Sequence, residues 1–376
     1  MHSPRSLRLG ALLLCAAVSF SLSKKSSSFS FSSASSSSSS ISLKSPDPLA
    51  AEIAREAAVL KSFPPEDDAL KQIREASEPL LGRADEALRA GRRLVALQRL
   101  APVFMNVAAA EYLRSLPAGT RVEVAAFEAE WARRGPDLTA PRAGAAAGLK
   151  PAAVRALAEA ALPEAKVFRD ASLEYGRSTA ADAGLYYLGA GRGQLAFVDF
   201  CRTLDEPAAG TAPDLRPLGP DIDALEKRML AAYTPPASID RHAEFISASS
   251  SLKEARELDA AGLRYGALLR LLQAALRFAP PAAVPVPAAE IAARLGTLRT
   301  RLAAEGVDHT IARIFLESAE GDLEAVAAKP GSAPAIAAAI VSEVLPRYFA
   351  ALGPAPRVAP RPDPVATITL VRWPYT

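Results

Sequence analysis

The chain has 376 residues, of which 50% are hydrophobic and only 6% aromatic, and its 44 basic and 41 acidic residues give a formal net charge of +3. Five of the basic residues and none of the acidic ones lie within the first 46 residues, so the remaining body carries about −2. A nearly neutral body argues against nucleic acid as the main partner, because phosphate binding requires a basic surface. Cys201 is the only cysteine of that body, which excludes an internal disulfide and a cysteine zinc site there.

Residues 1–22 have the pattern of an export signal peptide. Two arginines precede an apolar run from Ala11 to Leu22, and this run is shorter than the ~20 residues that span a bilayer. We therefore expect an extracytoplasmic protein, periplasmic or secreted. A membrane-anchored protein, held by an uncleaved signal or by a lipid on Cys15, is the alternative. The lipoprotein pattern requires a small residue before the modified cysteine, and Leu14 departs from it. An organelle transit peptide, also basic and rich in serine, is the competing interpretation.

Residues 23–48 are predicted to form a disordered, serine-rich linker. Serine dominates from Ser26 to Ser42, and such a segment buries too little apolar surface to offset its chain entropy. Two interpretations stay open: a flexible tether between a membrane and the folded body, or a low-complexity insertion without a further role.

Residues 49–352 are predicted to form an all-α body. Ala, Leu, Arg and Glu dominate this part and favour helices, whereas β-branched residues are sparse. We expect antiparallel helical hairpins stacked as an irregular α-solenoid or bundle, because Pro or Gly separates most of the periodic segments. Beyond the first hundred residues, the expected helical segments are Val122–Trp131, Val154–Phe168, Asp221–Tyr233, Ile239–Ala260, Arg264–Phe278, Ala288–Ala304, Val307–Ala327 and Ala335–Ala351.

One spaced pattern of small and apolar residues occurs twice, and every member of the second copy lies 171 residues after its counterpart. The first copy includes Ala90-Gly91 and Leu100, and the second includes Ala261-Gly262 and Leu271. In each copy we expect one helix to end at the Ala-Gly pair and a second helix to pack back against it.

The second copy resembles the turn and second helix of a tetratricopeptide-like repeat. The resemblance rests on Gly262 at the turn, on Ala267-Leu268, on Ala274 and on the break at Pro280. It implies stacked helix pairs with a concave binding face. Because no period of about 34 residues connects the matches, antiparallel hairpins of no particular family remain the alternative.

The segment Gly189–Gly193, with the sequence GAGRG, permits two interpretations. Glycines let backbone amides approach a phosphate, but here the third glycine comes one residue too early for the dinucleotide fingerprint. We therefore predict a helix–turn–helix with glycines at a tight crossing. Its expected core residues are Tyr186, Tyr187, Phe197, Phe200 and Cys201.

His242 and His309 are the candidate catalytic residues, with Asp240 beside the first and Asp308 beside the second. Such pairs suit a hydrolase with a histidine base, or a metal-dependent enzyme. Neither histidine has the H-E-x-x-H spacing, and both aspartates fall where helix N-caps are expected. We therefore predict no cofactor and no metal, and expect Asp240 and Asp308 to act as caps.

The C-terminus differs from the body. Residues 353–365 form a proline-rich linker, and residues 366–376 alternate as a β-strand does. The strand either adds to the sheet of a partner or folds back across the body, with Trp373 and Tyr375 as the candidate binding residues. Taken together, these patterns favour an exported protein-binding or scaffold protein of the cell envelope, with the hydrolase or metal-dependent enzyme as the alternative.

Overall fold

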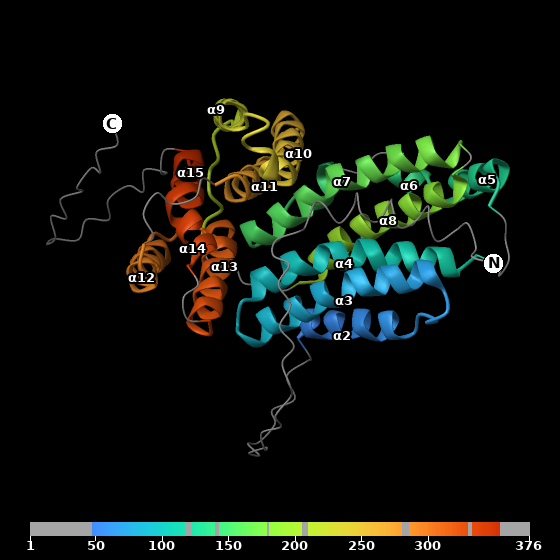
Figure 1. Ribbon diagram of the computed structural model, residues 1–376, viewed down its shortest axis with the longest axis horizontal. Coiled ribbons are helices and arrows are strands. Elements are labelled where there is room, and N and C mark those ends of the chain that lie inside the picture. Colours follow the sequence, from blue (N-terminus) through green and yellow to red (C-terminus); the bar gives the residue numbers. More distant parts are fainter. Residues whose placement is uncertain are drawn as a thin grey trace, which may run out of the picture.

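The computed structural model describes residues 47–116, 122–139, 143–178, 180–204, 210–279, 286–329 and 333–353, and the regular elements in these ranges are all helical (Figure 1). The first half contains α2 (Pro48–Lys61), α3 (Asp68–Arg89), α4 (Arg93–Arg114), α5 (Val124–Arg134), α6 (Pro136–Thr139), the 3-10 helix Ala143–Ala146, α7 (Ala152–Gly176) and α8 (Ala181–Thr203). The second half contains α9 (Gly219–Ala232), the 3-10 turn Ile239–Arg241, α10 (His242–Ala260), α11 (Arg264–Arg277), α12 (Ala288–Ala304), α13 (Thr310–Ala327), α14 (Ala335–Ala339), the π-helix Ile340–Val344 and α15 (Leu345–Ala351). The all-α prediction is confirmed. The leader, the strand at 366–376 and all of the two linkers except residues 47, 48 and 353 lie outside the described residues, and α2 begins at Pro48, one residue before the predicted start of the body.

The helices pack as neighbouring pairs. In Figure 1, α2, α3, α4, α8 and α7 follow one another in a stack. The pair of α10 and α11 packs against α7. Helix α13 contacts α4 and α7 where these two groups meet, and α14 and α15 lie beside it. One continuous core of Leu, Ala, Ile and aromatic side chains joins these groups, which explains why no disulfide is required.

The GAGRG segment lies inside the continuous helix α8, so the predicted helix–turn–helix is wrong at this place. Its glycines lie against α4 instead. A Cβ on Gly189 would lie 2.8 Å from Ala109 Cα, and a Cβ on Gly193 would lie 2.5 Å from Phe104 O. The missing side chains therefore let two helix backbones approach closely, which is a packing role and not a phosphate-binding one. Cys201 is buried on the same helix, as predicted.

We expect Gly193→Ala to lower the free energy of unfolding by about 2 kcal/mol, because the added methyl group would push α8 away from α4. Gly82→Ala is the matched control, since Gly82 also lies inside a helix but has no atom within 4 Å of the added Cβ. That control is expected to gain roughly 0.5–1 kcal/mol from helix propensity alone. Urea denaturation of both variants measures the difference, and equal shifts would contradict the close-packing role.

The two copies of the recurring pattern form the same helical hairpin. Gly91 ends the α3–α4 turn and Gly262 ends the α10–α11 turn, each with a φ of +75°. In both turns the residue after the glycine donates its N–H to the carbonyl five residues earlier, over 2.8 Å from Arg92 to Ala87 and 2.9 Å from Leu263 to Leu258. This Schellman geometry favours glycine, so the sequence alone predicted both turns correctly.

The similarity between the halves extends beyond these hairpins. Helices α2 and α9 begin 171 residues apart and both have 14 residues. Helices α7 and α13 begin 158 residues apart, and each follows a glycine of positive φ by four residues, Gly148 (+79°) and Gly306 (+67°). The two halves therefore share the length of one helix and the position of a turn glycine before another. The resemblance of the α10–α11 hairpin to a tetratricopeptide-like repeat remains a prediction.

Acidic side chains cap helices of the opposite half. Glu317 of α13 accepts hydrogen bonds from the N–H groups of Leu94 (3.0 Å) and Val95 (3.1 Å) at the start of α4. Glu159 of α7 accepts one from the N–H of Gly266 (2.8 Å) at the start of α11. Neither α4 nor α11 has a side-chain cap of its own. Each half therefore satisfies the free amide groups at a helix start in the other half.

Glu159 and Glu317 occupy equivalent places. Each is the eighth residue of its helix, α7 or α13. Each also forms an ion pair with an arginine four residues earlier, over 2.7 Å for Arg155 and 3.0 Å for Arg313. The exchange of caps is thus a feature that both halves share.

Candidate functional site

His242 lies on the surface at the first position of α10. Its Nδ1 is 2.6 Å from the Tyr233 hydroxyl, which follows α9. Asp240 is exposed in the preceding 3-10 turn, and α10 begins without a side-chain cap. The prediction that Asp240 caps this helix is therefore wrong. The 3-10 turn leads directly into α10, and the Ile239 carbonyl of that turn accepts the N–H of His242, the first residue of α10.

His309 is buried directly before α13. Its Nδ1 is 2.8 Å from the Tyr348 hydroxyl, and its Nε2 lies 2.9 Å from Glu305 Oε2. The neighbouring Asp308 accepts hydrogen bonds from the N–H of Thr310 (3.0 Å) and, across the molecule, from the N–H of Ala152 (2.6 Å). Asp308 thus stabilises the starts of α13 and α7, although it precedes the N-cap position of α13, which His309 occupies.

The two histidines do not share a site with their carboxylates. Among the described residues, no three His, Cys, Asp or Glu side chains are arranged so that they could hold a metal ion. His242 contacts Tyr233 and His309 contacts Tyr348, so each imidazole is oriented by a tyrosine and not by an adjacent aspartate. Neither imidazole therefore contacts the aspartate that neighbours it in the sequence, and the carboxylate that lies against His309 is that of Glu305.

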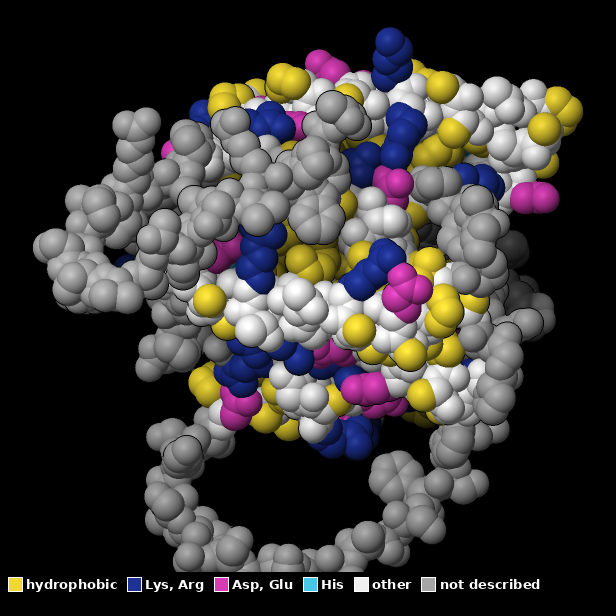
Figure 2. Space-filling view, turned by 90° about the vertical axis from the view of Figure 1, so that its left-hand side faces the viewer, with side chains coloured by type: hydrophobic (Ala, Val, Ile, Leu, Met, Phe, Trp, Pro, Cys, Tyr) yellow, Lys and Arg dark blue, Asp and Glu magenta, His cyan; other side chains and the backbone are white. Residues whose placement is uncertain are grey.

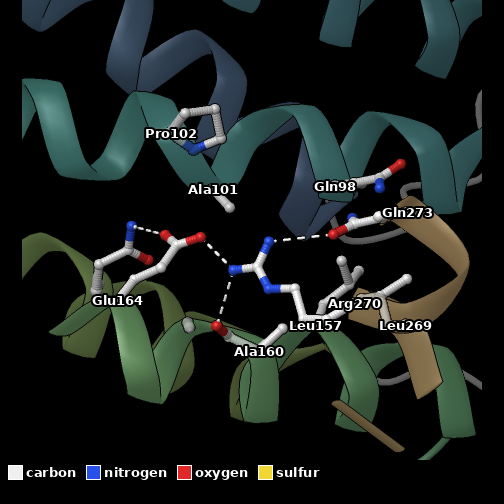
Figure 3. A pocket seen from close by; sticks show the side chains of 11 residues that line it. Gln98, Ala101, Pro102, Leu157, Ala160, Glu164, Leu269, Arg270 and Gln273 are labelled. Atoms are coloured by element: carbon white, nitrogen blue, oxygen red, sulfur yellow. Dashed lines mark hydrogen bonds and ion pairs between the residues drawn. The ribbon is translucent and has the colours of Figure 1, made fainter. Parts of the chain in front are cut away.

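The strongest concentration of buried charge surrounds Arg270 in the middle of α11 (Figure 3). Its guanidinium donates to Ala160 O (2.9 Å) and to Gln273 Oε1 (3.1 Å). It also forms ion pairs with Glu164 of α7 and with Glu254 Oε2 of α10, the latter over 2.8 Å. One buried cation therefore holds α10, α11 and α7 together.

Two further features shape this cluster. Burial raises the pKa of Glu254, and the nearby Arg270 guanidinium opposes that shift. Gln194 of α8 donates to Glu164 Oε2 over 2.5 Å, which connects α8 to the same network.

A cavity of about 30 Å³ lies beside these groups, between α4, α7, α8 and α11. This volume accommodates about two water molecules and no substrate of ordinary size. Gln194 Oε1 is buried there without a hydrogen-bond partner among the described residues, so a water molecule is the natural occupant. The side chains that line the cavity are those of Gln98, Ala101, Pro102, Leu157, Ala160, Ala161, Glu164, Gln194, Leu269, Arg270 and Gln273.

Sequence reasoning missed the Arg270 cluster. The only signal was one arginine within the apolar run Ala267–Ala275, on the face that the helical period assigns to the core. An isolated charge in such a run does not show which helices supply its partners, because Glu164 and Glu254 belong to other segments. The cluster joins helices, and its small cavity offers no place for catalysis on a substrate.

An apolar patch lies on the surface at α9 and α10. Leu230 (59% exposed), Ile239 (54%) and Ile246 (45%) account for three of the five large hydrophobic side chains that are exposed in the described ranges. The eleven residues from Met229 to Ile239 contain no charged side chain. The uncharged stretch ends at Ile239, and Asp240 and the Arg241–Glu244 ion pair lie between Ile239 and Ile246. Exposed apolar side chains that are bordered by polar ones in this way mark interaction surfaces.

The patch is organised around one aromatic pair. Tyr233 stacks on Phe245 with the ring centroids 4.2 Å apart, and its hydroxyl contacts His242. Leu230 precedes Tyr233 by three residues, and Ile246 follows His242 by four, so each shares a face with its aromatic neighbour. We define the α9–α10 patch as Leu230, Tyr233, Ile239, His242 and Ile246.

Charge elsewhere on the surface is mixed. On the face shown in Figure 2, basic and acidic side chains are interspersed, and no extended field of one sign appears. No helix among the described residues is long and apolar enough to cross a membrane. Trp373 and Tyr375, the candidate partner-binding residues of the tail, lie outside the described residues.

Comparison with known proteins adds no assignment: no family model, no curated protein and no solved structure matches this chain.

Proposed function

We propose that this chain is an exported, non-enzymatic scaffold of the cell envelope that binds another protein through the α9–α10 patch. The exposed patch is the observation that supports the proposal most. Interfaces are rich in tyrosine and in large apolar side chains at their centre and polar at their rim. The patch contains Tyr233 and three exposed large apolar side chains, with Asp240 and Glu244 beside them. The extracytoplasmic location is supported by the pattern of residues 1–22.

The finer architecture that we propose is an irregular α-solenoid or bundle of antiparallel hairpins, with a strand at 366–376 as an added element. Pairs such as α3–α4 and α10–α11 support it, since each buries its apolar faces against a neighbouring pair. In such an arrangement a patch on one hairpin stays in a constant position relative to the rest, which suits a scaffold.

The test compares wild-type protein with the full-length variant Leu230→Lys/Ile246→Lys. Partners are captured by cross-linking in envelope fractions, identified, purified and titrated against each protein. Two lysines in the centre of an apolar interface are expected to weaken binding at least ~10-fold. The matched control is Val167→Lys, because Val167 is an equally exposed (54%) apolar residue of α7.

The control is expected to retain wild-type affinity, with circular dichroism showing that all three proteins are folded. Equal affinity of all three proteins for the purified partner would remove the patch from the proposal. If no captured protein binds the wild-type chain after purification, the scaffold function itself is overturned.

A further inference from the structure

The described chain ends close to the segment that leads into α9. The N–H of Gly353 donates to Asp214 O over 2.8 Å, and the N–H of Arg216 donates to Ala351 O over 3.2 Å. These bonds fasten the end of α15 beside residues 214–216, which precede α9. The 23 residues that follow Gly353 therefore start from this point.

Helix α9 runs from the same point to the α9–α10 patch. The Arg216 guanidinium bridges the two elements, since it donates to Ala350 O (2.7 Å) and to Asp221 Oδ1 (2.8 Å) in the first turn of α9. Arg228 pairs with Glu343 over 2.7 Å and holds the later part of α9 against the π-helix before α15. Figure 1 shows α9 between α15 and α10.

The tail is long enough to reach the patch. Helix α9 has 14 residues and is about 21 Å long. The five prolines between 354 and 364 favour an extended backbone, which gives the spacer from Gly353 to Val365 a reach of roughly 37 Å. The spacer can thus pass along the whole of α9 and deliver residues 366–376 to Leu230 and beyond.

The chemistry of the tail matches that of the patch. Residues 366–376 have the sequence ATITLVRWPYT, with a single charged side chain, and alternation places Val371, Trp373 and Tyr375 on one face. Aromatic side chains bury large areas and pack well against a Tyr–Phe pair such as Tyr233 and Phe245. The stretch from Met229 to Ile239 contains no charged side chain, so contacts with it desolvate no charge, whereas Asp240, Arg241 and Glu244 border it on the α10 side.

We infer that residues 366–376 dock on the α9–α10 patch of the same molecule and cover it until a partner displaces them. The inference rests on the proposed function, because it assigns a regulator to the surface proposed for partner binding. If the tail covers the patch in about nine of ten molecules, the apparent dissociation constant for a partner is about tenfold weaker than that of the open patch.

A photo-cross-linking amino acid at position 246 of the full-length protein tests the contact directly. We expect cross-links within one chain from position 246 to residues 366–376, mapped by mass spectrometry. The same amino acid at position 167 is the control, since Val167 has similar exposure on α7, and it is expected to give none. Absence of tail cross-links from position 246, or cross-links only between two copies, would overturn the inference.

The accessibility of Trp373 provides an independent measurement that needs no cross-linker. In full-length Trp131→Phe protein, Trp373 is the only tryptophan that remains. Adding Leu230→Lys/Ile246→Lys is expected to raise its quenching by acrylamide roughly two- to threefold, because the tail loses its site. Adding Val167→Lys instead is expected to change nothing. Equal quenching in all three proteins would contradict docking.

Partner titration separates this inference from the proposed function. The full-length variant Trp373→Asp/Tyr375→Asp is expected to bind the purified partner about tenfold more tightly than wild type, because the open patch is no longer covered. If position 246 cross-links to the tail but Leu230→Lys/Ile246→Lys does not change partner binding, the docking inference holds and the proposed function is wrong. If that variant loses partner binding but position 246 gives no cross-links to the tail, the proposed function holds and the docking inference is wrong.

Discussion

Replacing Arg270 by methionine is expected to lower the free energy of unfolding by about 3–5 kcal/mol, although methionine keeps the unbranched apolar stem of the arginine side chain. The reason is the pair of carboxylates that lose their direct ion-pair partner through this change. Glu254 and Glu164 both lie against the guanidinium, with side chains that are only 18% and 23% exposed. An unpaired carboxylate in such a site loses its hydration without compensation. Urea denaturation of the purified full-length protein measures the change.

The control for this prediction is Arg256→Met. Arg256 of α10 also contacts two carboxylates, those of Asp223 and Glu226, each over 2.8 Å. Because the Arg256 side chain is 46% exposed, water replaces the lost ion pairs and the expected cost is below about 1 kcal/mol.

A second arm tests the mechanism. Arg270→Met combined with Glu254→Gln is expected to recover part of the loss, since the second change removes one of the stranded charges. Equal destabilisation by the two single arginine variants, or a double variant less stable than Arg270→Met, would show that burial of charge is not what makes Arg270 important.

Removal of the exchanged caps is the other change with a large expected effect. Glu317→Ala leaves the N–H groups of Leu94 and Val95 without their acceptor, and Glu159→Ala does the same for Gly266. A buried N–H without a partner costs about 1–3 kcal/mol, and the truncation also opens a cavity. We expect each variant to lose about 2–4 kcal/mol in urea denaturation.

Glu324→Ala is the matched control for these caps. Glu324 lies on the same helix as Glu317 and also reaches the start of α4, through Arg92 over 2.6 Å, but its side chain is 65% exposed. The expected cost is less than about 1 kcal/mol. Because Glu159 and Glu317 share no partner, the double variant is expected to lose close to the sum of the two single losses. A loss for the double variant no larger than for either single variant would contradict independent capping of the two halves.

Local patterns allowed much of the helical structure to be predicted. The segments expected at Ala288–Ala304 and Arg264–Phe278 agree with α12 and α11 to within one residue. The turns at Gly91 and Gly262 were also correct, because a glycine of positive φ after a small residue ends a helix by interactions within a few residues. The role of Asp308 at the start of α13 followed from the same local reasoning.

Other predictions failed where distant packing decides the outcome. Three glycines within five residues indicated a turn, yet α8 continues through them. Two of these glycines lie against α4, where a larger side chain would clash with the α4 backbone. Asp240 stands where a cap is expected but remains exposed, since a 3-10 turn replaces the capped helix start. Nothing in the neighbourhood of Arg270 in the sequence indicated that Glu164 and Glu254 would surround it.

The sequence by itself therefore determined which segments are helical and where most of them end, because helix propensity, apolar period and turn glycines act over a few residues. Only the tertiary structure decided how the helix starts are satisfied, which charge is buried and which apolar surface is left open. Glu159 and Glu317 cap helices more than 100 residues away, and Leu230 and Ile246 are exposed because no described helix covers them. These features depend on which helix surfaces pack against each other in the folded chain, and a local sequence pattern contains no information about that packing.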